Sequence, residues 1–387
     1  MIGLVAPAMR FPAISSLLAL RNLVHDRVRL AVTLIGVVFA VVLINVEVGI
    51  FLGFAKTTSS LVDHSGADLW IMPIATRDVD QVGPISERKF YQALAVPGVR
   101  NAARLNVEFA DLKRPDGGVQ SVLVVGFDPE RGLGGPWNVV EGDIRSLRFT
   151  NTVMIDDAYR EKLGVTHLGQ IVEIGQRRAQ VVGFTRGIRS FTQSPYVFTS
   201  TRSALDYSRI RADQTKYVLV SLLPGADPDT VKATLARDIS DVDVKTSAEF
   251  SRMTQVYWMF STGAGTALLL AALMGLAVGA VVVSQTLYAT TVDHLAEFGT
   301  LRAMGASRYY IYRVIVRQAL LSAVCGYVLG LLITLAVIRL AGDAGPMILL
   351  PPWLAIAMFG VTVVMCVGAA IISIRKVMLI DPSMVFK

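Results

Sequence analysis

The side chains that could do chemistry are spread along the chain without the spacing of a catalytic or metal site. There is no G-x-x-x-x-G-K-[ST] phosphate loop and no G-x-S-x-G serine elbow. The Asp156-Asp157 pair is typical of a helix start. The four histidines are scattered and have no metal-ligand spacing with cysteines or carboxylates: His25, His64, His167 and His294. We therefore expect no catalytic residue, metal or cofactor in this chain.

Four stretches lack charged side chains for long enough to cross a bilayer, which takes roughly 20 apolar residues in a helix. They are Leu30–Val46, Met253–Val292, Gln318–Ile338 and Ala344–Ile374. Because apolar and polar residues do not alternate within them, they predict helices and not barrel strands. The sequence thus predicts a membrane protein of four transmembrane α-helices, with a large α+β periplasmic domain between helices 1 and 2.

The expected boundaries follow from these stretches. They are 1–29 for a cytoplasmic amphipathic helix, 30–55 for span one, 56–252 for the outer domain, 253–288 for span two, 289–313 for a cytoplasmic coupling region, 314–340 for span three, 341–350 for a short outer loop, 351–374 for span four and 375–387 for the tail. Within the outer domain, residues 119–205 are expected to form a β-rich insertion into an α+β core made from both ends of the segment.

Charge predicts orientation and excludes nucleic acid as a partner. The net charge is +7, yet residues 56–252 hold 25 basic and 24 acidic residues, so no basic face is expected on the outer domain. Lys and Arg favour the cytoplasmic side. They gather before span one (Arg10, Arg21, Arg27, Arg29), between spans two and three (Arg302, Arg308, Arg313) and after span four (Arg375, Lys376, Lys387). Both termini are therefore predicted to be cytoplasmic.

The outer domain must be held by its own core, because both cysteines, Cys325 and Cys366, fall within spans. Strands are predicted over 106–112 and 119–125, around the turn 115–118, and over 68–72, 152–155, 170–174, 179–185, 217–222 and 242–245. Helices are predicted over 87–95 and 157–163, and another begins with Asp227 as N-cap and Pro228 in its first position. Ser247 is expected to cap a helix that runs unbroken into span two.

Small and polar residues within the spans have open interpretations. The pairs Gly275 with Gly279 and Gly326 with Gly330 have the spacing that lets membrane helices approach closely, either within the chain or between subunits. Glu47 is the one carboxylate of span one. It is expected near the outer interface, where it would be hydrated, and not as a proton relay.

The most informative cytoplasmic stretch runs from Glu297 to Ser307, E-F-G-T-L-R-A-M-G-A-S. A short helix ending at Gly305 would present Leu301 and Met304 beside two charges, Glu297 and Arg302. Such a helix could insert an apolar knob into a groove of a partner, although a solvated loop helix is the alternative.

This stretch resembles the E-x-G-x-L-R-A-x-G-A-S signature of the MacB and FtsX-like ABC transporter permeases, also called type VII. The entry Ala19-Leu20-Arg21-Asn22-Leu23 and the ending Ile380-Asp381-Pro382 are similar to that family too, and the resemblance covers the whole chain. The Ala67-Asp68-Leu69-Trp70 and Val125-Gly126-Phe127-Asp128-Pro129 segments look most like the DevC-type permease of the heterocyst glycolipid exporter.

The resemblance implies a permease in the bacterial inner membrane that exports a lipid or another amphiphile. It implies a coupling helix docked on a separate ABC ATPase (Glu297, Gly299, Leu301, Arg302, Ala303, Met304, Gly305, Ala306). It also implies a homodimer, a periplasmic membrane fusion protein and an outer-membrane channel. Two alternatives stay open: an FtsX-like regulator of cell-wall hydrolases, and a membrane receptor without an ATPase.

Overall fold

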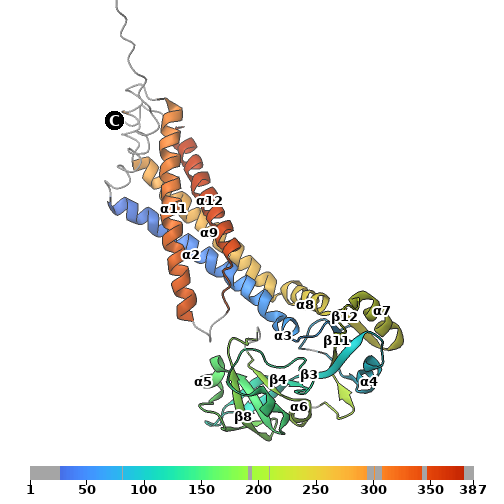
Figure 1. Cartoon of the computed structure of the whole chain (residues 1–387). Coiled ribbons are helices and arrows are strands. Elements are labelled where there is room, and N and C mark those ends of the chain that lie inside the picture. The colour runs from blue at the N-terminus through green and yellow to red at the C-terminus, as the bar shows by residue number, and fades with distance from the viewer. Residues whose placement is uncertain are drawn as a thin grey trace, which may run out of the picture. The chain divides into compact units, whose positions relative to one another are not determined.

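The computed structural model describes residues 27–80, 82–190, 194–208, 210–293, 300, 307–341 and 347–378 (Figure 1). The chain divides into two compact units. The helical unit comprises Met1–Leu52, Ala267–Gly342 and Ile348–Lys387, and the α+β unit comprises Gly53–Thr266 and Asp343–Met347. The predicted interfacial helix before residue 27 lies outside the described residues.

Four long helices dominate the helical unit (Figure 1). They are α2 (Arg27–Thr58), α9 (Ala264–Asp293), α11 (Arg308–Ala341) and α12 (Pro352–Met378). Each contains a stretch long and apolar enough to cross a membrane: Ala31–Thr58, Ala264–Thr286, Tyr312–Ala341 and Pro352–Ile372. The four predicted transmembrane helices are therefore confirmed by length and composition.

The α+β unit contains the remaining elements. They are α3 (Ser60–Asp63), β1 (Leu69–Pro73), β2 (Ile85–Ser86), α4 (Arg88–Leu94), β3 (Val99–Lys113), β4 (Val119–Phe127), β5 (Val139–Gly142), η1 (Ile144–Arg148), β6 (Thr152–Asp156), η2 (Asp157–Tyr159), α5 (Arg160–Leu163), β7 (Ile171–Ile174), β8 (Arg177–Thr185), β9 (Tyr196–Ser200), α6 (Thr201–Tyr207), β10 (Gln214–Thr215), β11 (Tyr217–Leu222), α7 (Pro228–Asp238), β12 (Val242–Thr246), α8 (Ser247–Val256) and η3 (Tyr257–Ser261).

Both ends of the α+β unit contribute to one open sheet, in the order β12-β1-β11-β3. All of its pairings are antiparallel. One face is covered by α4 and α7, whose Phe90, Val231 and Leu235 pack against Ile71 and Val218. Asp227 caps α7 by accepting a hydrogen bond from Thr230 N, and Pro228 follows, as predicted.

Six strands between these ends form a closed circuit of pairings, β3-β4-β9-β6-β8-β7, in which β7 returns to β3. Two of the pairs, β4 with β9 and β6 with β8, are parallel. The strands alternate between two cores. Val122 and Val124 of β4 pack inside the circuit with Ile155 and Val197, whereas Leu123 faces the other core, around Trp70.

One prediction about helix continuity is wrong. The helix that starts in the α+β unit does not run unbroken into span two, because α8 gives way to the π-helical segment η3 and then to a bend. Gly263 in this bend has a φ of +80°, a left-handed conformation that glycine adopts without strain. The expected span two, 253–288, therefore includes residues 253–261, which belong to α8 and η3. A turn at Ser59 separates α2 from α3.

Candidate functional site

The coupling residues predicted from the sequence cannot be placed. Glu297, Gly299, Leu301, Arg302, Ala303, Met304, Gly305 and Ala306 all lie outside the described residues. The nearest described residue on the C-terminal side is Ser307, whose side chain accepts a hydrogen bond from Tyr310 N at the start of α11. We therefore describe two sets of contacts: those between the long helices of the helical unit, and those of the short helices α3 and α8 in the α+β unit.

All four glycines predicted for helix packing face α2 of the same chain. A methyl group built on Gly279 of α9 would lie 2.9 Å from Ala40 Cβ, and one on Gly275 would lie 3.5 Å from Leu43 Cγ. On α11, a methyl group at Gly326 would lie 2.4 Å from Val37 Cγ1, and one at Gly330 would lie 2.6 Å from Val41 Cγ1. Within this chain, α2 is thus the helix against which both α9 and α11 pack closely.

Polar groups of α2 lie near the same contacts. Glu47 is half-buried, and its Cγ lies 3.6 Å from the place that a side chain on Gly275 would take. Asn45 is 1% exposed, and its amide has no hydrogen-bond partner among the described residues.

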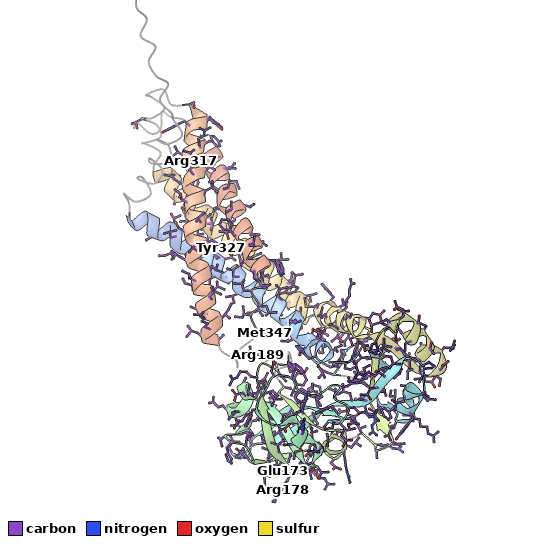
Figure 2. The ribbon with its side chains drawn as sticks, viewed as in Figure 1. Glu173, Arg178, Arg189, Arg317, Tyr327 and Met347 are labelled. Atoms are coloured by element: carbon purple, nitrogen blue, oxygen red, sulfur yellow. The ribbon has the colours of Figure 1, made fainter. Side chains whose placement is uncertain are left out.

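A hydrogen bond joins α11 and α12. Tyr327 (Figure 2) donates from its hydroxyl to the carbonyl of Ala355 at 2.5 Å, and its ring contacts that of Phe359 edge to face, with 5.2 Å between centroids. Because a hydroxyl in an apolar environment is costly unless it is bonded, this contact fixes the relative position of the two helices.

Two short helices of the α+β unit adjoin the long helices in sequence: α3 follows α2, and α8 precedes η3 and α9. We call α3 and α8 the stalk base. Gln255 Nε2 of α8 donates to Ser59 Oγ, just before α3, at 2.8 Å. Leu61 and Val62 of α3 are 1% exposed and belong to the same core as Phe250. The two chain segments that lead to spans one and two are therefore joined within the α+β unit.

An aromatic cluster connects the stalk base to the sheet. Trp70 of β1 contacts both Tyr217 of β11 and Phe250 of α8, with ring centroids 5.2 and 5.1 Å away, and the last two rings lie 5.9 Å from each other. All three side chains are buried. Aromatic pairs at these distances add about 0.5–1.5 kcal/mol each to the free energy of burial. These contacts join α8 to β1 and β11.

The N-terminus of α8 is fixed at three points. Thr246, and not the predicted Ser247, is its N-cap, because Thr246 and Glu249 form a reciprocal capping box. Glu249 also accepts from Lys232 Nζ of α7 at 2.6 Å. The Ser247 hydroxyl instead donates to the carbonyl of Ala67. The start of α8 is thus tied to a neighbouring helix and to the segment that enters β1.

Sequence patterns gave no sign of a buried acidic pair in the segment after β1. Asp78 and Asp80 are 2% and 3% exposed, and Asp80 N donates to Asp78 Oδ1 at 2.9 Å. Neither carboxylate oxygen of Asp80 has a hydrogen-bond partner among the described residues. Burial, with a smaller contribution from the negative charge of Asp78, raises the pKa of Asp80 to about 7, although the nearby Lys216 acts to lower it. Such a carboxyl changes its charge near neutral pH.

Two known protein-family models match most of the chain. Residues 30–238 match the MacB-like periplasmic core domain, and residues 269–382 match the FtsX-like permease C-terminal domain. The first match alone covers more than half of the chain. The protein therefore belongs to the MacB/FtsX family of ABC transporter permeases, and its fold is that of a type VII permease.

Similar proteins include uncharacterized ABC transporter permeases of Mycobacterium tuberculosis (Rv2563) and Mycobacterium bovis (Mb2592). Each is 24% identical over 374 residues, which cover 95% of this chain and 98% of the relative. The chain is thus a multi-pass membrane subunit and not itself the ATPase.

Two solved structures are similar to part of the chain. The periplasmic region of MacB from Actinobacillus actinomycetemcomitans is 10% identical, has a TM-score of 0.38, and covers 50% of this chain and 96% of its own. The extracellular domain of the transporter YknZ from Gram-positive bacteria is 17% identical, has a TM-score of 0.35, and covers 46% of this chain and 98% of its own. At these scores the likenesses add nothing to the family match.

Proposed function

We propose that this chain is the permease of an ABC export system, driven by a separate ATPase that carries ATP and magnesium. It transmits motion from the cytoplasmic side, through α2 and through α9 with α8, to the α+β unit. The cargo is a lipid or another amphiphile, as in the DevC-type exporters that the sequence resembles.

One observation is the main support for this proposal: the chain segments that lead to spans one and two contact each other at the stalk base. The Gln255–Ser59 hydrogen bond and the Trp70, Tyr217 and Phe250 cluster join them to the sheet. A device that relays force needs a rigid junction of this kind, whereas a receptor that binds a ligand in its outer domain does not.

The remaining parts of the proposal follow from charge and from the family. The Lys and Arg residues of the short segments favour an inner-membrane protein with both termini in the cytoplasm. Two copies pair, and the stretch from Glu297 to Ala306 docks on the ATPase. A periplasmic membrane fusion protein and an outer-membrane channel complete the export path.

The test is purification of the full chain with its bound subunits, followed by measurement of ATP hydrolysis. We expect Leu301→Asp with Met304→Asp to release the nucleotide-binding subunit, because two carboxylates replace the apolar knob. Ser307→Asp is the matched control: it adds a charge nearby, yet Asp can keep the N-cap of α11.

Retention of a nucleotide-binding subunit by the double variant, with unchanged ATP hydrolysis, would contradict this coupling site. Absence of any nucleotide-binding subunit from the wild-type preparation would favour the receptor. Recovery of a cell-wall hydrolase in place of a fusion protein would favour the FtsX-like regulator.

A further inference from the structure

Strand β3 is open to one side along part of its length. On that side, β11 pairs with Val99–Leu105 and β7 pairs with Leu112 and Lys113. Between these two partners lies a gap of about six residues, or roughly 20 Å at the rise of an extended strand. No described strand pairs with β3 along this gap.

The register shows which backbone groups face the gap. Gly175 N donates to Asp111 O on the open side, and Arg114 N donates to Gly118 O on the β4 side. Because backbone groups of successive residues point to opposite sides of a strand, Phe109 faces the open side, as Asp111 does. Its ladder partner, Leu123, turns its own N–H away from β3, toward the carbonyl of Pro195.

The N–H and C=O groups of Phe109 therefore have no partner among the described residues. The same holds for the N–H of Asp111, whose carbonyl alone is bonded. Unpaired backbone groups of this kind are the template on which an added strand forms.

A cleft lies beside this edge. Its volume is about 640 Å³. It is lined by residues 108–111 and Lys113 of β3, by Val119 of β4, by Glu173, Gly175 and Gln176, and by Asp206, Tyr207 and Ser208 at the end of α6. Two of the lining residues, Gly175 and Tyr207, pack closely against each other. Gly175 has a φ of +56°, and a side chain there would lie 2.6 Å from Tyr207 O. The space beside β3 is thus bounded and of a size that accepts a short segment.

The charges around the cleft select its occupant. Glu108 pairs with Lys216 at 2.5 Å. Glu173, labelled with Arg178 in Figure 2, has Lys113 and Arg178 as its direct cross-strand neighbours. Asp111 and Asp206 have no basic partner among the described residues. Apolar surface adjoins them, because Phe109 is 37% exposed and Val119 is 66% exposed.

We propose that the open edge of β3 at Phe109 is a docking site for an extended, basic segment of another protein, which binds by strand addition. The backbone of the segment pairs with Phe109 and Asp111, its basic side chains meet Asp111 and Asp206, and an apolar side chain covers the Phe109 ring. A second copy of this chain is disfavoured at the site, since a two-fold contact would bring the same carboxylates face to face.

The test uses the full chain in nanodiscs and a fluorescent peptide, acetyl-Lys-Val-Lys-Val-Lys-amide. We expect a dissociation constant below about 1 mM. Amide hydrogen exchange over residues 107–111 should be slower when the peptide is present. A peptide N-methylated at its two valines keeps its charge but loses backbone donors, and should bind about tenfold more weakly. The Glu-Val-Glu-Val-Glu peptide should not bind.

Three variants separate the backbone contribution from the side-chain contributions. Phe109→Pro removes the N–H that faces the gap without removing a bond to β4, and should weaken binding about tenfold. Phe109→Ala keeps that N–H and should weaken binding less. Asp111→Asn with Asp206→Asn should reduce binding severalfold at low salt and leave little salt dependence. Thermal unfolding of each variant confirms that the fold is retained.

Equal affinity for the parent and the N-methylated peptide would overturn strand addition, as would unchanged exchange over residues 107–111. Absence of binding by the wild-type chain would overturn the site altogether. None of these outcomes bears on the coupling segment, because the peptide assay needs neither ATP nor an ATPase.

Discussion

The buried carboxyl of Asp80 should make the stability of the α+β unit depend on pH, and replacement by asparagine should remove that dependence. The pKa of Asp80 is about 7 in the folded protein, against 3.8 for an ordinary aspartate. Between these values the folded state holds a proton that the unfolded state has released. Stability is therefore greatest below the unfolded pKa, falls as pH rises through this window, and levels off above the folded pKa.

The size of the effect follows from the shift. A difference of about three pKa units corresponds to about 4 kcal/mol at 1.36 kcal/mol per unit. About two of these units lie between pH 5 and pH 8, so about 3 kcal/mol should be lost over that range. For a domain of this size the loss amounts to a decrease on the order of 10 °C in melting temperature.

The assay is thermal unfolding of the full chain in nanodiscs at about pH 5 and about pH 8. Asp80→Asn cannot ionise, so its melting temperature should change far less than that of the wild type and should exceed it at the higher pH. Glu130→Gln, at an exposed position, is the control and should follow the wild type. Parallel pH curves for wild type and Asp80→Asn would refute the assignment of this proton to Asp80.

Three further substitutions test the packing. Gly330→Leu should destabilise the helical unit by about 1–3 kcal/mol, because the new side chain overlaps Val41. Gly360→Leu is the control, because a side chain there meets open space. Unfolding in detergent compares the two variants, and an equal loss of stability would contradict the close contact between Gly330 and α2. Phe250→Ala should cost the α+β unit about 3–5 kcal/mol in thermal unfolding, and a loss below about 1 kcal/mol would show that the aromatic cluster does not hold the stalk base. Thr246→Ala should cost about 1 kcal/mol through the lost cap, and Thr246→Ser should restore it; failure of serine to rescue would assign the effect to the methyl group.

Much of the architecture is predictable from sequence because local rules decide it. Absence of charge marks the four helices, and the turn Pro115-Asp116-Gly117-Gly118 marks the hairpin between β3 and β4. The Asp227-Pro228 start of α7 and the role of Asp156 as a cap, accepting from Ala158 N, are local features too.

Non-local features were not predictable. The strand β9 was missed, and its parallel pairing with β4 depends on residues about 70 positions apart, for which no local signal exists. The break at Gly263 was missed because the flanking residues are apolar on both sides and resemble one continuous helix. The gap in β3 depends on where β11 and β7 end, and Asp80 carries no motif; both become visible only when distant segments are brought together.

The place of β1 in the sheet constrains how the protein can be made. Its neighbours on either side are β11 and β12, which the ribosome produces about 150 residues later. Until that stretch has been synthesised, Leu69, Trp70 and Ile71 stay uncovered, and the nascent domain cannot close. Biogenesis of this subunit therefore has a period in which an apolar strand awaits its neighbours, and a chain truncated before residue 242 should be a substrate for chaperones and proteases.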